Sequence, residues 1–493
     1  MSFTYLSKSD FLKYLDCPNY LWLYKNKKEV LPPEEYSEQR TEQGYEIEGY
    51  ARQLFPNGIM IHSFEEHAQQ ETQRLVAEGV TTIFQGTVIT STGLLAMADI
   101  LTYDKESQSW TIHEVKSTNT IKEQHLNDLA FQRVAFEDAG YKIGKTTIIH
   151  LNKEYVRIPE VAPSELLIEE DVTSQVEKLI PTIRLQAYEA FASLSSLEEP
   201  EGCSCREKTK AHHCPGFEYL NPDIPEYSIY DLTHINSKTL IELMHRDIYL
   251  IPEIPSDIKL NTVQRNQVQV AITGQPIIDR EGISSLLGEL EYPLYFFDYE
   301  TIATALPLYD KCHPYQQIPF QYSLHLISEP GSKIEHFEFL GRSIQENPML
   351  ELLENLKKQI GPSSNIIVWY KSFESSRNTE MGKLYPEYAE FLADVNSRIF
   401  DLMDIFKDQL FVHPDFRGSN SIKHVLPVLA PELSYKELDV QNGEMAAARW
   451  HEAVSGKVDG EKANETFESL LTYCGLDTFA MVRIYEYLLT TPA

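Results

Sequence analysis

Residues 292–301 read YPLYFFDYET, and this stretch decides the fold of the C-terminal half. A short apolar run of this kind is typical of a buried β-strand. Asp298 and Glu300 lie two positions apart within it, so on a strand both carboxylates point to the same face. Burying two like charges is costly unless cations neutralise them. The stretch therefore predicts a buried strand that presents metal ligands.

Two later segments add side chains to the same site. Residues 366–370, IIVWY, indicate a second buried strand, and Glu374 follows just beyond it. Near the end of the chain, Tyr473 and Asp477 are four positions apart, so on a helix they share one face. We expect these side chains to converge on the strand that carries Asp298.

This set of residues resembles the active site of the DEDD 3′–5′ exonucleases, which have an RNase H-like fold. Asp298 and Glu300 match the first family motif, and Tyr473 with Asp477 matches the tyrosine form of the last. Glu374 stands where the family usually has an aspartate. The resemblance implies that the four acids hold two divalent cations, Mg²⁺ or Mn²⁺, and that Tyr473 helps to position the attacking water.

Two nearby features have a structural and a functional interpretation. Asp401, at the end of an apparent strand over 398–402, is expected to support local structure rather than catalysis. Residues 418–423, GSNSIK, indicate a polar loop that enters a helix. Its amides and Lys423 would suit a phosphate, and a simple helix N-cap explains the pattern equally well.

The N-terminal half contains a second candidate site, centred on residues 110–116, WTIHEVK. On a strand, Glu114 and Lys116 face the same side. The apolar run 94–99 ends in Asp99, and an Asp and a Glu on adjacent strands can hold a divalent cation. A lysine beside them can orient water and offset phosphate charge. Glu-x-Lys alone is a weak signal, but the helical stretch 129–136 that follows strengthens it.

These residues resemble the RecB-type branch of the PD-(D/E)XK nucleases, whose pattern is Asp, Glu-x-Lys and a helix with Gln-x-x-x-Tyr. The matching residues are Asp99, Glu114, Lys116 and Gln132, with Phe136 in place of the tyrosine. Residues 44–48, GYEIE, resemble the glycine-rich helix start that carries an earlier metal ligand in this branch. Glu48 would then be a ligand where histidine is common, and a solvated helical glutamate is the alternative.

Four cysteines bracket this half: Cys17, Cys203, Cys205 and Cys214. Four thiolates suit a [4Fe–4S] cluster or a structural Zn²⁺ ion. The layout of one cysteine near the start and three after the nuclease core resembles exonucleases of the CRISPR-adaptation kind and helicase-linked nucleases of the AddB kind, which implies the iron–sulfur cluster. The Cys203-x-Cys205 spacing is tighter than in those families, so Zn²⁺ and a metal-free cluster stay open as alternatives.

Composition limits the protein class. The chain of 493 residues has 43 basic and 74 acidic residues, a formal charge of -31, so a simple basic surface for nucleic acid is excluded. Six cysteines are too few for a disulfide scaffold. The start of the chain does not resemble a secretory signal, and no apolar run has the length of a membrane span. We therefore expect a cytoplasmic protein that does not bind membranes.

The expected fold class is α/β, with three parts. These are a PD-(D/E)XK restriction-endonuclease-like domain over 1–220, a helical connector over 221–290 and an RNase H-like exonuclease domain over 291–493. This order is similar to that of an uncharacterised bacterial family that joins the two kinds of nuclease.

The hypothesis from the sequence is a metal-dependent nuclease with two active sites. The C-terminal site would trim 3′ ends and the N-terminal site would cleave DNA. The expected partner is DNA, single-stranded or 3′-ended, with RNA also open, and nothing in the sequence indicates a protein partner. One alternative is a catalytically silent nucleic-acid-binding or assembly subunit of a repair or defence complex. Another is a redox iron–sulfur protein.

Overall fold

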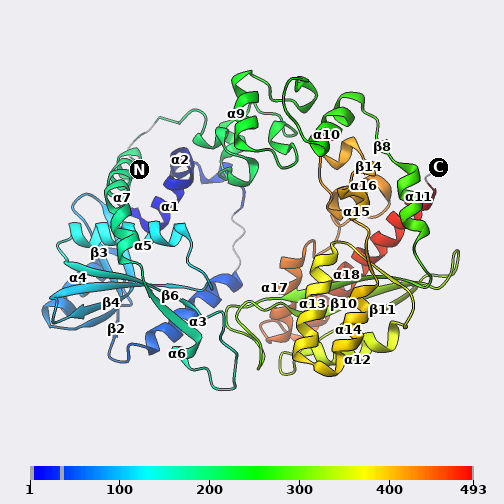
Figure 1. The fold of residues 1–493 in the computed structure, drawn as a ribbon. Coiled ribbons are helices and arrows are strands. Elements are labelled where there is room, and N and C mark those ends of the chain that lie inside the picture. Colours follow the sequence, from blue (N-terminus) through cyan, green and yellow to red (C-terminus); the bar gives the residue numbers. More distant parts are fainter. Residues whose placement is uncertain (1–4, 34–37, 195, 197, 491–493) are drawn as a thin grey trace. The chain divides into compact units, whose positions relative to one another are not determined.

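The computed structural model describes residues 5–33, 38–194, 196 and 198–490. The chain divides into two compact units. Unit 1 consists of Met1–Pro225 and Thr304–Tyr315, and unit 2 of Glu226–Ala303 and Gln316–Ala493. Both units combine helices with β-sheet (Figure 1), so the expected α/β class is confirmed. Of the helices in the described ranges, none combines the length and apolar character needed to cross a membrane.

Within its described residues, unit 1 has one sheet of seven strands in the order β2-β3-β4-β5-β6-β7, with β1 paired to β4. The strands are β1 (Leu6–Ser7), β2 (Ile59–Met60), β3 (Thr82–Ile89), β4 (Leu94–Asp104), β5 (Ser109–Lys116), β6 (Ile143–Leu151) and β7 (Leu167–Asp171). β5 runs antiparallel to β4 and parallel to β6. The predicted strand at 110–116 is thus confirmed as β5, whereas Asp99 lies in the middle of β4 rather than at its end.

Both faces of this sheet are covered, because successive residues of a strand point to opposite sides. Leu101 of β4 packs in one apolar core with Phe131 of α5, and its neighbour Ile100 packs in another with Ile47 of α3. In Figure 1, α5 and α3 accordingly lie on opposite sides of the sheet. The helices of unit 1 are α1 (Lys8–Asp16), α2 (Pro18–Asn26), α3 (Glu38–Gln53), α4 (Glu65–Ala77), α5 (Glu123–Asp138), α6 (Pro163–Leu166), α7 (Thr173–Ser193) and α8 (Phe217–Leu220).

The main sheet of unit 2 has the order β11-β10-β9-β12-β13. β9 pairs antiparallel with β10 and parallel with β12, which places the predicted strand of residues 292–301 at the centre of the sheet. The strands are β9 (Leu294–Ile302), β10 (Ile318–Ile327), β11 (Glu335–Leu340), β12 (Asn365–Val368) and β13 (Ile399–Asp401). A separate pair joins β8 (Ile277–Ile278) to β14 (Phe411–Val412).

Alternation along β9 again assigns the helices to two faces. The Tyr299 hydroxyl donates to Asn378 on α13, whereas Asp298 and Glu300 face α18. In Figure 1, α18 crosses the sheet behind the strands, and α13 and α14 lie in front. The helices are α9 (Ser237–His245), α10 (Thr262–Thr273), α11 (Arg280–Gly288), α12 (Pro348–Gln359), α13 (Lys371–Leu384), α14 (Ala389–Ser397), α15 (Asp404–Lys407), α16 (Ile422–Leu429), α17 (Gly443–Val454) and α18 (Gly460–Thr490). Of the expected connector over 221–290, residues 226–290 group with this unit and residues 221–225 with unit 1.

Candidate metal centres

In unit 2, the central strand and the C-terminal helix bring acidic side chains together. The closest group is formed by Asp298 and Glu300 of β9 with Cys474 of α18, whose ligand atoms all lie within 4.8 Å of one another. Asp477, one helical turn after Tyr473, adds its negative charge to both β9 carboxylates. The predicted residues of β9 and α18 therefore meet at one place. Cys474 was not predicted, although it directly follows Tyr473.

Glu374 completes this acidic site from the first turn of α13, just beyond β12 as the sequence predicts. Its side chain is buried, with 1% of the residue exposed. Among the described residues, the carboxyl group of Asp298 is the side-chain hydrogen-bond partner of Glu374, and no side-chain amide, hydroxyl or cation reaches its oxygens. A buried pair of carboxylates is costly unless a proton or a cation neutralises it. The oxygens of Glu374 are thus available to a cation.

Burial raises the pKa of every carboxyl group in this set, and repulsion within the set adds to it for Asp298 and Glu300. The pKa of Asp298 lies well above its usual value because of burial first, and then because of the charges of Asp477, Glu300 and Glu374. The pKa of Glu300 is likewise well raised, by burial and by Asp477. Burial raises the pKa of Glu374 to about 8 and that of Asp477 to about 6. Cations bound here would relieve this unfavourable concentration of charge, so the residues fit divalent metal ions.

Two tyrosine hydroxyls border the carboxylates. The Tyr435 hydroxyl donates to Asp477 Oδ1 at 2.6 Å, and the Tyr473 hydroxyl also stabilises the charged form of Asp477. Burial, reinforced by the nearby carboxylates, raises the pKa of both phenols. Both therefore stay protonated at neutral pH and act as donors. Tyr435 lies in the loop before α17 and was not predicted, because no local pattern links it to α18.

The accessory features of unit 2 favour the structural interpretations. The Asp401 carboxylate accepts from the backbone N–H groups of Tyr370 and Lys371, so it holds the turn between β12 and α13. Ser421 caps α16 by accepting from the Lys423 N–H. Lys423 nevertheless lies near the acidic site. Its positive charge lowers the pKa of Glu300 and of Asp477, although burial has the larger effect and raises both. It is the cation that a phosphate near this site would meet.

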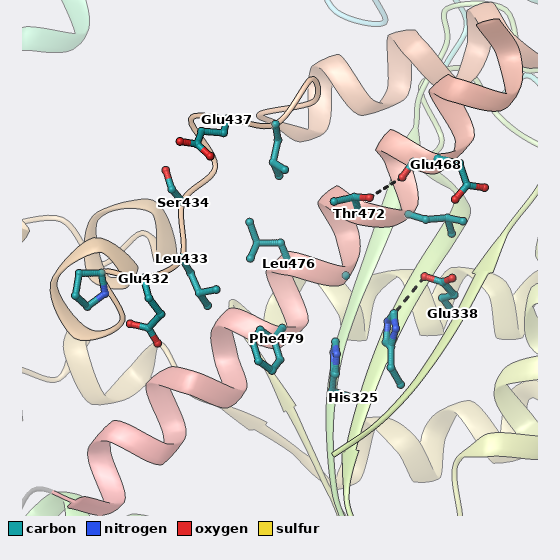
Figure 2. A pocket seen from close by; sticks show the side chains of 15 residues that line it. His325, Glu338, Glu432, Leu433, Ser434, Glu437, Glu468, Thr472, Leu476 and Phe479 are labelled. Carbon is teal, nitrogen blue, oxygen red and sulfur yellow. Dashed lines mark hydrogen bonds and ion pairs between the residues drawn. The ribbon is translucent and has the colours of Figure 1, made fainter. Parts of the chain in front are cut away.

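A cavity of about 790 Å³ lies on the other flank of α18 (Figure 2). Figure 2 shows His325 and Glu338 of the sheet on one side, and Leu433 and Ser434 of the loop before α17 on the other, with Leu476 between them. Four glutamates line it, and among the described lining residues there is no lysine or arginine. This cavity is therefore a poor phosphate site, in contrast to the surroundings of Lys423.

In unit 1, Glu114 is the centre of a buried polar network, with 1% of the residue exposed. Its Oε1 accepts from Lys116 Nζ at 2.6 Å and from Lys8 Nζ at 2.8 Å, and its Oε2 accepts from Gln132 Nε2 at 2.5 Å. Because these cations outweigh burial, the pKa of Glu114 is lowered. The predicted residues Glu114, Lys116 and Gln132 therefore meet in the structure.

Asp99 lies beside this network without joining it directly. Its Oδ2 accepts from the Val115 N–H at 2.8 Å. Burial, and then the charge of Glu114, raises the pKa of Asp99 to about 8, while Lys8 acts in the opposite direction. Asp99 and Glu114 are thus neighbours across β4 and β5. Within the described residues, the acidic groups of unit 1 do not form a cluster as tight as that of Asp298 and Glu300.

The structure corrects the expected helix start and the solvated alternative for Glu48, whereas its role as a metal ligand stays a prediction. Residues 44–48 do not start a helix, because α3 already begins at Glu38. Glu48 is not solvated either: it is buried and accepts from Arg52 Nη1 at 2.6 Å and from Gln85 Nε2 at 2.5 Å. Its charge contributes to the raised pKa of Asp99, so it lies at the margin of the site.

Two residues of the network were missed from the sequence. Asp128 accepts from Lys116 Nζ at 2.5 Å and from Gln132 Nε2 at 3.2 Å. A signal for it existed, since Asp128 lies one helical turn before Gln132 on the same face of α5. Lys8, at the start of α1, has no pattern that connects it with β5. Phe136, at the position of the family tyrosine, lies in the apolar core.

The four cysteines also converge. The Sγ atoms of Cys17, Cys203, Cys205 and Cys214 all lie within 4.8 Å of one another, and none of the four forms a disulfide. Cys17 separates α1 from α2, and the other three follow α7. This arrangement can hold a metal ion at a place where two distant parts of unit 1 meet.

We expect the stability of unit 2 without metal to fall as pH rises from 6.5 to 8. The folded state retains a proton on Glu374, with a pKa of about 8, that the unfolded chain has already released near its ordinary value of 4.5. Because the folded state then binds more protons, the free energy of unfolding decreases with pH in this window. Burial lowers the pKa of His325 to about 3, so the folded state binds fewer protons at this residue than the unfolded chain. This makes stability increase with pH, but only below the ordinary pKa of 6.5, outside the window considered.

Calorimetry in EDTA and in Mg²⁺ tests this expectation. Mg²⁺ should raise the melting temperature more at pH 8 than at pH 6.5, and Glu374→Gln should flatten the pH dependence of the metal-free protein. A melting temperature in EDTA that does not change, or that increases, between pH 6.5 and 8 contradicts the expectation.

We also expect Lys8→Met to destabilise unit 1. Lys8 Nζ lies 2.8 Å from Glu114 and 3.4 Å from Asp128, both buried. Removing one partner of a buried ion pair costs about 3–5 kcal/mol; here about 1–3 kcal/mol is expected, since Lys116 still compensates both carboxylates. The melting temperature should fall by about 2–4 °C per kcal/mol. Lys105→Met, at an exposed position, is the matched control, and equal melting temperatures for the two variants contradict the role of Lys8.

Comparisons with known proteins match part of the chain. Residues 295–421 match the model of a domain of unknown function, DUF2779. The chain is 27% identical over 230 residues to the "Uncharacterized protein MG366 homolog" of Mycoplasma pneumoniae, covering 42% of this chain and 34% of that protein. It is 25% identical over 291 residues to the "Uncharacterized protein UU173" of Ureaplasma parvum, covering 53% of this chain and 40% of that protein. The chain thus spans well under half the length of these relatives, and β9, which carries Asp298 and Glu300, begins within one residue of the region that matches DUF2779.

Proposed function

We propose that this protein is a divalent-metal-dependent nuclease with two phosphodiester-hydrolysing sites. Unit 2 is proposed as an RNase H-like 3′–5′ exonuclease of the DEDD kind, and unit 1 as a DNA-cleaving PD-(D/E)XK domain. The observation that carries the proposal is the convergence of Asp298, Glu300, Glu374 and Asp477 in a buried site, where Glu374 and Asp298 share a hydrogen bond and no side-chain amide, hydroxyl or cation of the described residues reaches Glu374.

In unit 2 these four carboxylates would hold the cations. Divalent cations, when bound, lower the pKa of an attacking water and stabilise the charge that develops on the phosphate. The Tyr473 hydroxyl, kept protonated by burial, would help to position that water. Tyr435 holds Asp477 through a 2.6 Å hydrogen bond and so fixes one ligand. Lys423 would attract the phosphate towards the site.

In unit 1, Asp99 and Glu114 would provide the metal ligands, and Gln132 would hold Glu114 in place. Lys116 would orient the attacking water and offset phosphate charge. Glu48 lies further out, paired with Arg52. The formal charge of -31 leaves phosphate contacts to local cations such as Lys423, so binding should weaken strongly with salt.

One observation favours a second possibility for unit 1 alone. Lys8 and Lys116 already neutralise Glu114 and Asp128, which reduces the need for a cation at these two carboxylates. Unit 1 would then bind nucleic acid without cleaving it, and unit 2 would be the only source of hydrolysis.

The deciding experiment uses the purified chain with Mg²⁺ or Mn²⁺ on single-stranded DNA and RNA, each labelled at the 5′ end in one set and at the 3′ end in another. Stepwise shortening of the 5′-labelled strand, with release of labelled mononucleotide from the 3′-labelled one, indicates 3′ trimming. Internal fragments indicate cleavage by unit 1. EDTA should stop both reactions. If neither polymer is hydrolysed with either metal, the chain is a binding or assembly subunit instead.

A further inference from the structure

The tetrathiolate cluster, Cys17, Cys203, Cys205 and Cys214, has a geometry that distinguishes between metal centres. A single Zn²⁺ ion has Zn–S bonds of about 2.3 Å, which places the sulfurs of a tetrahedral site about 3.8 Å apart. In a [4Fe–4S] cluster each cysteine thiolate binds a different iron. The distance between two cysteine sulfurs then includes the distance between two irons, so these sulfurs lie much further apart than around one ion. The four Sγ atoms all lie within 4.8 Å of one another, which fits a single ion and is too close for the four corners of a [4Fe–4S] cluster.

We propose that the tetrathiolate cluster binds one tetrahedral Zn²⁺ ion and that the resemblance to iron–sulfur nucleases does not extend to the cofactor. The short Cys203-x-Cys205 spacing agrees with this. It brings two ligands together in one tight turn, in which the Cys205 N–H donates to Cys203 Sγ at 3.3 Å. Two thiolates of one tight turn can bind the same ion more easily than they can bind two different irons of a [4Fe–4S] cluster.

The surroundings of the cluster are those of a closed structural site. Asn221 Nδ2 donates to Cys203 Sγ at 3.6 Å. Cys17 precedes α2, whose N-terminal amides favour a thiolate. Donors that contact the sulfur atoms in this way fix the orientation of the thiolate ligands. All four ligand positions are taken by protein, so the site has no place for a substrate.

His213 lies outside the group of described ligand atoms that converge at the tetrathiolate cluster. Its Nε2 lies 3.0 Å from the Lys208 carbonyl oxygen, and its ring stacks on Phe217 with centroids 3.4 Å apart. The ligand set is therefore sulfur only.

The ion would also fix α1. This helix runs from Lys8 to Asp16, directly before Cys17. Its nine residues span about 13 Å at 1.5 Å per residue, so the ion holds one end while the other presents Lys8 to Glu114. Loss of the ion should therefore loosen the contact of Lys8 with Glu114 as well as the junction with residues 203–214.

The test measures metal in the wild-type chain, produced in medium that supplies both iron and zinc and purified without oxygen. The proposal expects one zinc per chain, no stoichiometric iron or acid-labile sulfide, and no visible absorption. X-ray absorption at the zinc edge should show four sulfurs at about 2.3 Å. Four irons with four sulfides per chain, or a metal-free chain with disulfides among these cysteines, would overturn it. These measurements do not depend on nuclease activity, so they stand even if the proposed function fails.

Two further measurements guard against a variant that fails to fold. Exchange of the bound ion for Co²⁺ in the wild-type chain should produce the d–d and thiolate charge-transfer bands of a tetrahedral site with four sulfurs. Cys205→Ser should reduce the zinc content at least tenfold, whereas Cys312→Ser, at a buried free cysteine outside the cluster, should retain one zinc. Equal zinc content in the two variants contradicts the proposed ligand set.

Discussion

Asp298→Asn is expected to lower the rate of 3′ trimming by about 10³-fold, because electrostatic stabilisation of the transition state is usually the largest catalytic contribution. Asp298 provides a carboxylate within 4.8 Å of Glu300, and asparagine keeps its shape while removing the charge that binds cations. Single-turnover rates with 5′-labelled single strands at saturating Mg²⁺ measure the effect. Cleavage by unit 1 should continue at the wild-type rate.

The same variant should be more stable than the wild type in EDTA. Burial first, and then repulsion from Asp477, Glu300 and Glu374, raises the pKa of Asp298. The metal-free site must therefore take up a proton on folding, which asparagine does not require. A gain of about 1 kcal/mol corresponds to about 2–4 °C. This result would separate a catalytic loss from unfolding. The control Asp408→Asn, at an exposed position, should change neither quantity. Trimming by Asp298→Asn at the wild-type rate would refute the site.

Lys116→Ala is expected to lower cleavage by unit 1 by about 10²–10³-fold, the range typical of a group that moves or orients a proton. Lys116 Nζ lies 2.6 Å from Glu114 and 2.5 Å from Asp128. Lys8 also contacts both carboxylates, so the variant should keep its fold while it loses the ammonium group next to the proposed water. Trimming by unit 2 should be unchanged, since none of its site residues comes from unit 1. The assay counts internal fragments from circular single-stranded DNA, which offers no 3′ end.

The matched control for this variant is Lys105→Ala, at an exposed position of the same unit. Circular DNA that stays intact with the wild-type chain would show that unit 1 does not cleave, and the binding role would then be favoured. If Lys116→Ala lowers trimming and internal cleavage together, the two activities share one site and the assignment to two units is wrong.

Local sequence patterns predicted the residues that a single element presents together. Asp298 and Glu300 were found because side chains two residues apart on a strand point to the same face. Tyr473 and Asp477 were found because side chains four residues apart on a helix lie on the same face. Their convergence with Glu374 could be expected only through the resemblance to a nuclease family. The starting residue of α3 was not evident, so Glu48 was assigned an environment that it does not have.

The sequence by itself determined the α/β class, the buried strands β5 and β9, and the residue types of both candidate sites. Only the tertiary structure decided that Lys8 and Asp128 enclose Glu114, that Tyr435 holds Asp477, and that four thiols approach within 4.8 Å. The physical reason is that sequence patterns act within one strand or helix, whereas tertiary contacts join segments far apart in the chain. Periodicity reports which side chains leave one strand or helix on the same face, whereas contacts between distant segments depend on how whole elements pack, and that leaves no repeat in the chain.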